Sequence, residues 1–135
     1  PMNRPNFFTN VFFLCLILVL SSYCLQENPV KQCKEFIKTQ DLEVLLEICS
    51  EEVAYEESDD VSIIEKQELK SKLGAFFSSN PIRVFKVKHE GGSQHGAKYM
   101  IGTYLSSKGK TFMLKVKFHH QNGVLKISAI KFSPE

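Results

Sequence analysis

The spacing of apolar residues changes once along the chain, at Asn80-Pro81. Before this dipeptide, apolar residues recur every three or four positions, as on one face of an α-helix. After it they alternate with polar residues, as in a strand with one buried face. Proline also pushes the preceding residue out of helical geometry. The sequence therefore predicts an α+β fold in which helices precede strands.

Three helices are expected in the first part. The first covers residues 29–39, and the second begins after an N-cap at Asp41. Ser62 and Glu65 have the spacing of a capping box, which predicts that the third helix begins there and ends near Phe77.

Between the second and third helices, residues 53–55 are expected to form a short strand. An acidic stretch follows, and four carboxylates in such a stretch are typical of a solvated loop. These carboxylates belong to Glu56, Glu57, Asp59 and Asp60.

Four alternating segments follow Pro81 and are joined by short turns, of which Asn122-Gly123 is a strong hairpin signal. The expected strands are residues 82–89, 98–105, 111–119 and 124–132. Consecutive strands with short turns form an antiparallel meander, and its apolar face needs a cover. We therefore expect three N-terminal helices packed on a curved antiparallel meander of four to five strands.

The first residues have the features of an export signal. Arg4 precedes an unbroken apolar run at 11–20, and Ser22 and Cys24 fit the small-residue positions before a cleavage site. We expect a signal peptide at 1–24, a single domain at 25–135, and a periplasmic or secreted location. Two alternatives stay open: an uncleaved membrane anchor, and lipidation of Cys24.

The mature domain would keep two cysteines, Cys33 and Cys49. An even pair in an oxidising compartment is able to form a disulfide. Each also falls on the apolar face of its helical segment, as a buried thiol would. Both alternatives stay open.

Charge is distributed unevenly. Residues 25–68 carry four Lys and thirteen Asp or Glu, whereas residues 69–135 carry twelve Lys or Arg and two Glu. A basic half is typical of proteins that bind anionic surfaces, although two oppositely charged halves also neutralise each other when packed together.

The stretch FFSSNPIRVFKVKHEGGSQHGAKYMIGTY, from Phe76 to Tyr104, resembles a family of exported Bacteroidetes proteins catalogued only as domain of unknown function 4783. The element order also resembles the nuclear-transport-factor-2-like (cystatin-like) cone. This resemblance implies a curved sheet with a pocket between sheet and helices, and it supplies no catalytic residues.

Enzymes with the cone fold place ionisable groups inside that pocket, so we searched the strands for them. Glu90 is the only carboxylate between Leu69 and Pro134, and it adjoins a glycine turn. A proton-abstracting enzyme needs a carboxylate base in an apolar pocket, which this pattern does not provide. The sequence also has no phosphate loop or nucleophile elbow, so neither catalysis nor a cofactor is predicted.

The histidines give a weak signal. His89 and His95 flank the glycine-rich turn and are kept as turn candidates. His119 and His120 are adjacent on a strand, so their side chains point to opposite faces and are poorly placed to share one metal ion. No metal site is predicted.

Four residues are candidates to line the pocket that the resemblance implies: Tyr99, Tyr104, Phe112 and Val116. By parity, the two tyrosines lie on opposite faces of one strand. The outward lysines would form a basic sheet face that solubilises the protein or binds an anionic glycan or a protein. These lysines are Lys86, Lys88, Lys115 and Lys117.

The sequence thus favours an extracytoplasmic binding or protein-interaction module without catalytic activity. A homodimer through the sheet is one way to use such a module. The alternative is a pocket-containing protein or enzyme that handles a small molecule or lipid. The partner is a small molecule, glycan or protein; nucleic acid is not expected, because no aromatic residues are interleaved with the lysines. Contact with a membrane is expected only through the leader, if the leader is uncleaved or is lipidated at Cys24.

Overall fold

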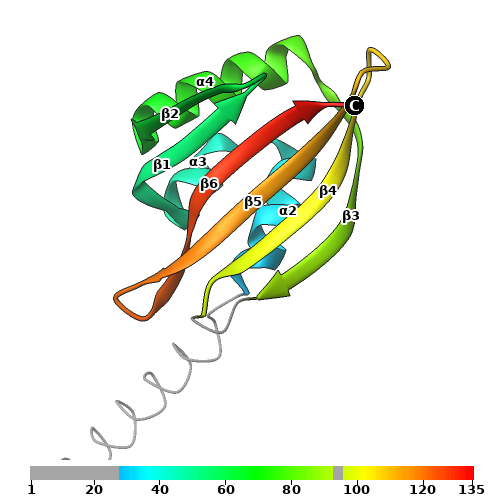
Figure 1. Cartoon of the computed structure of the whole chain (residues 1–135). Helices are drawn as coiled ribbons and strands as arrows, with labels where there is room; N and C mark the ends of the chain where they lie inside the picture. Colours follow the sequence, from blue (N-terminus) through cyan, green and yellow to red (C-terminus); the bar gives the residue numbers. More distant parts are fainter. Residues whose placement is uncertain (1–27, 93–95) are drawn as a thin grey trace, which may run out of the picture.

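Six strands form one curved sheet, and the helices lie against one side of it (Figure 1). The computed structural model describes residues 28–92 and 96–135, so the expected signal peptide and His95 lie outside the described residues. The helices are α2 (Pro29–Thr39), α3 (Leu42–Ile48) and α4 (Lys66–Ser79). The strands are β1 (Cys49–Glu57), β2 (Asp60–Glu65), β3 (Ile82–Gly92), β4 (Lys98–Ser106), β5 (Thr111–Gln121) and β6 (Val124–Pro134).

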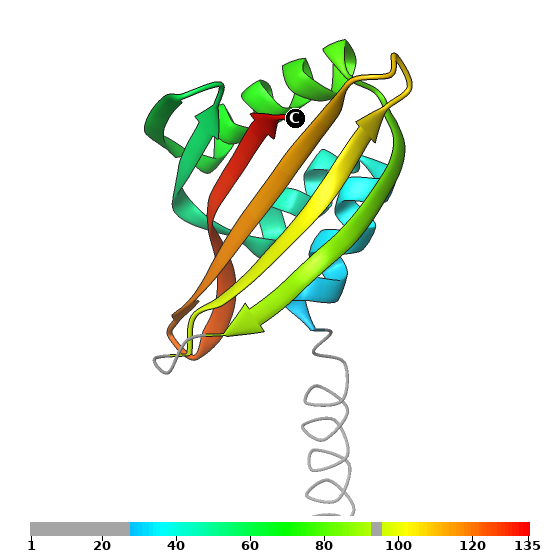
Figure 2. The same ribbon diagram turned by 45° about the vertical axis from the view of Figure 1, so that its right-hand side comes forward.

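The strand order is β2-β1-β6-β5-β4-β3. All neighbouring pairs are antiparallel except β1 and β6, which run parallel. The expected meander is therefore present as β3–β6, and the first strand joins it beside the last. The long strands bend around α2 and α3 (Figure 2), while α4 packs on α3 and beside β1 and β2.

The expectation of four to five strands was too low. The strand expected at residues 53–55, between the second and third helices, is present within β1, but a sixth strand was not expected. Residues 60–65 form β2, so Ser62 and Glu65 lie in a strand instead of a capping box. The α4 helix begins after Glu65, whose side chain makes no capping hydrogen bond. Pairing with β1 along the whole of β2 overrides the local helix signal.

The acidic stretch is not a loop as expected but a tight hairpin. Glu56 and Glu57 end β1, and Asp60 begins β2. Ser58 and Asp59 make the turn with φ angles of 52° and 68°, a left-handed conformation that Asp and Asn tolerate better than most residues.

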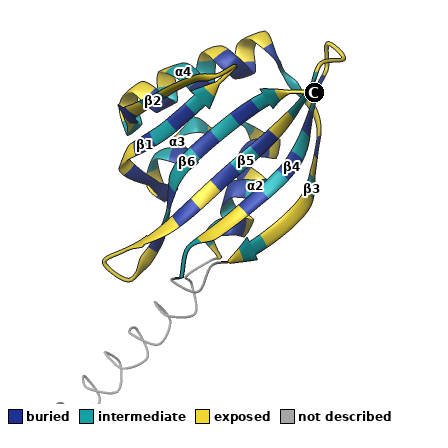
Figure 3. Cartoon of the chain, in the orientation of Figure 1, coloured by how far each residue is buried: buried dark blue, intermediate teal, exposed yellow. Residues whose placement is uncertain are grey.

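Buried and exposed residues alternate along the long strands (Figure 3). We call the sheet side that packs on the helices the inner face and the opposite side the outer face. On β5, Leu114 and Val116 are buried on the inner face, whereas Lys115 and Lys117 lie on the outer face, as the alternation predicts.

Aromatic rings fill much of the space under the sheet. Phe76 of α4 stacks on Phe132 with ring centroids 3.9 Å apart, and it meets Phe112 and Tyr104 edge to face at 5.1 and 5.6 Å. Such pairs add to the stabilisation that their buried area provides. The interior at this end of the sheet is therefore a packed core.

The end of α4 is tied to the sheet through Asn80. Its backbone N–H donates to the Phe76 carbonyl at 2.8 Å, and its side-chain amide donates to the same oxygen at 3.3 Å. The Tyr104 hydroxyl donates to the Asn80 carbonyl. The motif around Asn80-Pro81 thus fixes the junction between helix and meander, which is a structural role.

Candidate functional site

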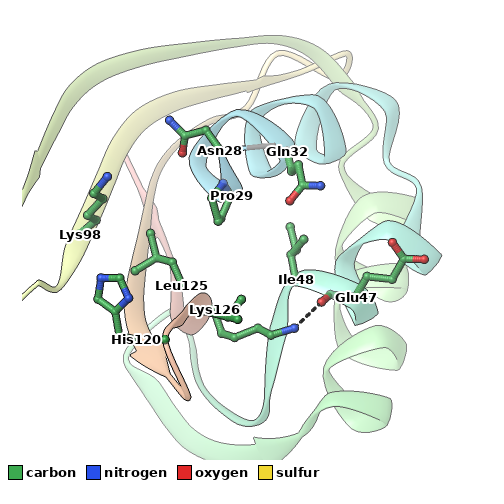
Figure 4. A pocket seen from close by; sticks show the side chains of 11 residues that line it. Asn28, Pro29, Gln32, Glu47, Ile48, Lys98, His120, Leu125 and Lys126 are labelled. Carbon is green, nitrogen blue, oxygen red and sulfur yellow. Dashed lines mark hydrogen bonds between the residues drawn. The ribbon is translucent and has the colours of Figure 1, made fainter. Parts of the chain in front are cut away.

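A hollow of about 500 Å³ lies at the end of the sheet where α2 begins (Figure 4). We call it the end pocket. Its walls come from the start of α2, the end of α3 and the ends of three strands. The lining residues are Asn28, Pro29, Gln32, Glu47, Ile48, Lys98, His120, Gly123, Val124, Leu125 and Lys126.

Three nitrogen-bearing side chains from different strands border the end pocket: Lys98 of β4, His120 of β5 and Lys126 of β6. The Lys126 ammonium donates to the backbone carbonyl of Glu47 at 2.8 Å, while the Glu47 carboxylate points away from Lys98 and His120 (Figure 4). The electrostatic character of this end is therefore positive, and it suits an anion.

The His120 ring lies close to the backbone of Gly96. Gly96 has a φ of +79°, and a β-carbon there would lie 2.9 Å from His120 Cδ2. Glycine suits both the conformation and the close ring. His119 borders a different hollow on the outer face, so the two histidines do point to opposite sides.

A second hollow, of about 510 Å³, lies on the outer face; we call it the outer groove. It runs over β4 and β5, and its lining residues are Gly92, Ala97, Lys98, Tyr99, Ile101, Lys115, Lys117, Phe118 and His119. Tyr99 is 38% exposed and lies next to Lys117, its partner across the β4–β5 pair. An aromatic ring is thus interleaved with the lysines, contrary to the expectation.

Three of the four expected pocket residues line neither hollow. Tyr104 and Val116 are buried in the core, and Phe112 is partly buried against it. Only Tyr99 borders a hollow, and that hollow is on the outer face. The prediction that Tyr99 and Tyr104 face opposite sides is confirmed.

The Tyr104 hydroxyl is fully engaged. Besides donating to Asn80, it accepts a hydrogen bond from the Gln40 side chain at 2.9 Å. Burial raises the pKa of Tyr104 to about 12. This tyrosine is neutral at physiological pH and has a structural role.

The two cysteines are buried free thiols. Burial raises the pKa of Cys49 to about 12 and that of Cys33 further, with a smaller contribution from the charge of Cys49. Because the thiolate is the reactive form, neither is suited to act as a nucleophile.

Three of the carboxylates named in the sequence analysis have partners near the surface. Glu56 binds Lys131 at 2.9 Å, and Glu90 of β3 binds Lys34 of α2. Glu57 accepts a hydrogen bond from Tyr55 at 2.9 Å. In the described part of the chain no group of three or more His, Cys, Asp or Glu is arranged to hold a metal ion.

The turn histidines are not brought together by any described contact. His89 is exposed on β3 opposite Ile101, and His95 lies outside the described residues. Across residues 28–92 and 96–135, no helix has the length and apolar character that a membrane-spanning segment requires.

Sequence reasoning missed Lys98 and Lys126. Each follows a turn, and in a meander alternate turns lie at the same end of the sheet. The start of β4 after the first hairpin connection and the start of β6 after Asn122-Gly123 therefore lie at one end of the sheet, where both lysines gather.

Comparison with known structures supports the fold. A DUF4783 family protein from Bacteroides fragilis is 25% identical, with a TM-score of 0.68 over 74% of this chain and 92% of that one. A Bacteroides ovatus relative is 19% identical, with a TM-score of 0.70 over 75% and 90%. A putative ketosteroid isomerase from Shewanella frigidimarina shares the fold at 15% identity, with a TM-score of 0.62 over 78% and 92%.

No curated protein matches the sequence. The sequence profile of a domain of unknown function, DUF4783, matches residues 30–133, nearly the whole described part of the chain. The structural relatives from Bacteroides carry the same domain. The chain therefore belongs to the DUF4783 family, whose fold is that of the nuclear-transport-factor-2-like and cystatin-like proteins.

Proposed function

We propose that this protein is an exported, non-catalytic binding module that holds a small anionic molecule in the end pocket. The observation that carries the proposal is the convergence of Lys98, His120 and Lys126 on one hollow of about 500 Å³. Pockets for small molecules are roughly 300–1,000 Å³ and combine an apolar wall with a few polar groups. Ile48 and Leu125 supply that apolar wall.

The interior supports a role without catalysis. Among the described residues, the buried polar side chains are Ser50, Asn80 and Ser106, and none of these is an acid or base. Tyr55 and Tyr104 are also buried, and burial raises the pKa of both. Proton abstraction of the ketosteroid-isomerase kind needs a carboxylate in an apolar pocket, and the Glu47 carboxylate points away from the end pocket (Figure 4).

The extracytoplasmic location rests on the sequence of residues 1–24, which has the pattern of a cleaved leader. Intact-mass measurement of the protein recovered from an exporting host tests it. We expect a product that begins at Leu25. A product that keeps the leader, or one that carries lipid on Cys24, contradicts cleaved export.

Binding is tested by native mass spectrometry of the protein purified from an exporting host. We expect a bound small acidic molecule in the wild type and its loss in Lys98→Gln, which removes a charge and retains an uncharged polar side chain. Lys108→Gln is the matched control, because Lys108 is an exposed lysine in the turn between β4 and β5. Lys126 is avoided because its hydrogen bond to α3 is structural.

Two results contradict the proposal. One is a wild-type protein that carries no ligand and whose melting temperature does not change with phosphate, citrate or other small anions. The other is a bound molecule that Lys98→Gln retains as fully as Lys108→Gln does, since the ligand would then lie elsewhere.

A further inference from the structure

We infer that the outer groove is a second binding site, which takes an anionic polysaccharide through stacking on Tyr99 and ion pairs with Lys115 and Lys117. The outer groove lies on the opposite side of the sheet from the core, and only Lys98 borders both it and the end pocket. The inference is therefore independent of the proposed function.

The Tyr99 ring lies against the strand next to it. Gly91 of β3 is its partner across the β3–β4 pair, and a β-carbon at Gly91 would lie 2.6 Å from two ring atoms of Tyr99 and from its hydroxyl oxygen. The ring thus lies across the glycine backbone, in the space that any other side chain would occupy. Since Tyr99 is still 38% exposed, part of the ring is available to a ligand.

A ring that lies over the sheet is a suitable platform for a sugar. The face of an aromatic ring is electron-rich and attracts C–H groups that carry a partial positive charge, such as those on one face of a pyranose. Because the sheet sets the ring's orientation before binding, little side-chain entropy is lost when the ligand arrives.

The lysines beside the ring are available for anions. Lys117 is the cross-strand partner of Tyr99, and Lys115 is the partner of Ile101. In the described part of the chain neither forms a salt bridge, whereas the neighbouring Lys131 is paired with Glu56 at 2.9 Å. Carboxylate or sulfate groups of a ligand would therefore meet uncompensated positive charge.

The outer groove continues across the sheet, which favours a chain-like ligand over a compact one. A shallower hollow of about 240 Å³ shares Lys115 and Lys117 with it and extends to Ala54 of β1 and Val61 of β2. Ala54 is paired with Ala129, and these two small side chains keep the middle of the hollow low. The ion-paired Glu56 and Lys131 also line it. An extended polymer is able to lie across the strands there.

The aromatic content of the outer groove favours a glycan over other polyanions. Among the described residues that line it, Tyr99 is the one exposed phenol or phenyl ring, because Phe118 is fully buried. Single-stranded nucleic acid is held by several aromatic residues that stack successive bases. An acidic protein would use a wider apolar surface with complementary pockets. One ring with flanking ammonium groups matches the repeating sugar and carboxylate of a uronate chain.

The test is calorimetric titration of the exported protein with an oligogalacturonate, and with its fully methyl-esterified form as the uncharged match. We expect binding of the charged form and at least tenfold weaker binding of the ester. Tyr99→Ala should weaken binding about tenfold and Tyr99→Phe very little. Lys117→Gln should weaken it about threefold to tenfold and reduce its salt dependence, whereas Lys108→Gln should not.

Gly91→Ala supplies a sharper test, because it displaces the Tyr99 ring and leaves every side chain that binds the ligand in the protein. It should weaken binding as Tyr99→Ala does, while thermal unfolding shows that the protein remains folded. Four results overturn the inference: equal binding of acid and ester, unchanged binding in the Tyr99 and Lys117 variants, preference for polyglutamate or oligothymidylate, or a homodimer that buries the outer groove and binds no glycan.

Discussion

On each face of the β3–β4 pair an aromatic ring lies over a glycine, but the two rings have different roles. On the inner face Phe85 lies over Gly102, and a β-carbon there would be 2.7 Å from the ring. On the outer face Tyr99 lies over Gly91, and a β-carbon at Gly91 would be 2.6 Å from the Tyr99 side chain. Phe85 is 7% exposed because helices cover it, whereas Tyr99 is 38% exposed. A ring over a glycine is therefore no functional sign in itself; what covers its other side decides its role.

Removing the two rings should separate these roles most clearly. Phe85→Ala deletes a core side chain and should lower the free energy of unfolding by about 3–5 kcal/mol. Tyr99→Ala exposes a strand that already faces solvent and should cost less than about 1 kcal/mol. Urea unfolding of both variants measures the difference. Similar losses would mean that Tyr99 is as important to the core as Phe85.

Filling the two glycines is the next largest test. Gly102→Ala forces a β-carbon to within 2.7 Å of the Lys86 carbonyl as well as the Phe85 ring, and backbone cannot swing away. We expect a loss of about 1–3 kcal/mol. Gly91→Ala meets only the far end of the Tyr99 side chain, so the ring should move and stability should fall by less than about 1 kcal/mol. A larger loss for Gly91→Ala in thermal unfolding would contradict this view.

The buried tyrosine of β4 offers a smaller effect. Tyr104→Phe leaves the Asn80 carbonyl and the Gln40 amide without their hydroxyl partner, and should cost about 1–2 kcal/mol at neutral pH. The matched change Tyr99→Phe should leave chemical denaturation unchanged. Equal losses of stability in Tyr104→Phe and Tyr99→Phe would contradict a structural role for the Tyr104 hydroxyl that Tyr99 lacks.

The burial of Tyr104 should also make the stability of the wild-type protein depend on pH in the alkaline range. The pKa of Tyr104 is raised by burial to about 12, so the folded protein keeps a proton that the unfolded chain begins to lose near pH 10. The contribution of Tyr104 to the free energy of unfolding is fully present below pH 10 and should be lost as the pH rises toward 12. In Tyr104→Phe this fall should be shallower, since only Tyr55 and other groups then contribute. Identical slopes in pH-dependent melting curves would contradict a buried, neutral Tyr104.

The elements that the sequence predicts correctly are those marked by local patterns of residues. The strands of the meander alternate cleanly and are bounded by turn residues, so the sequence indicates them directly. The β1–β2 hairpin was misread because Ser62 and Glu65 fit a capping box, and because the pairing that makes β1 a strand comes from β6, over seventy positions away. Local patterns carry no information about a partner so distant.

The candidate sites show the same limit. The parity of Tyr99 and Tyr104 was predictable, but the depth of the core was not, so Tyr104, Phe112 and Val116 were assigned to a pocket that aromatic packing fills. Lys98 and Lys126 attracted no attention because each is an ordinary lysine beside a turn. Their significance comes from the sheet, which places the ends of β4 and β6 at one edge of the molecule.

The parallel contact between β1 and β6 has a consequence for how the chain folds. Among the described strands β6 is synthesised last, and it lies between β1 and β5, so the sheet cannot close until β6 has been made. Contacts between such distant segments slow folding, because a long loop must be ordered before any pairing compensates for it. The helices α2, α3 and α4 are therefore made well before the sheet that covers them is complete.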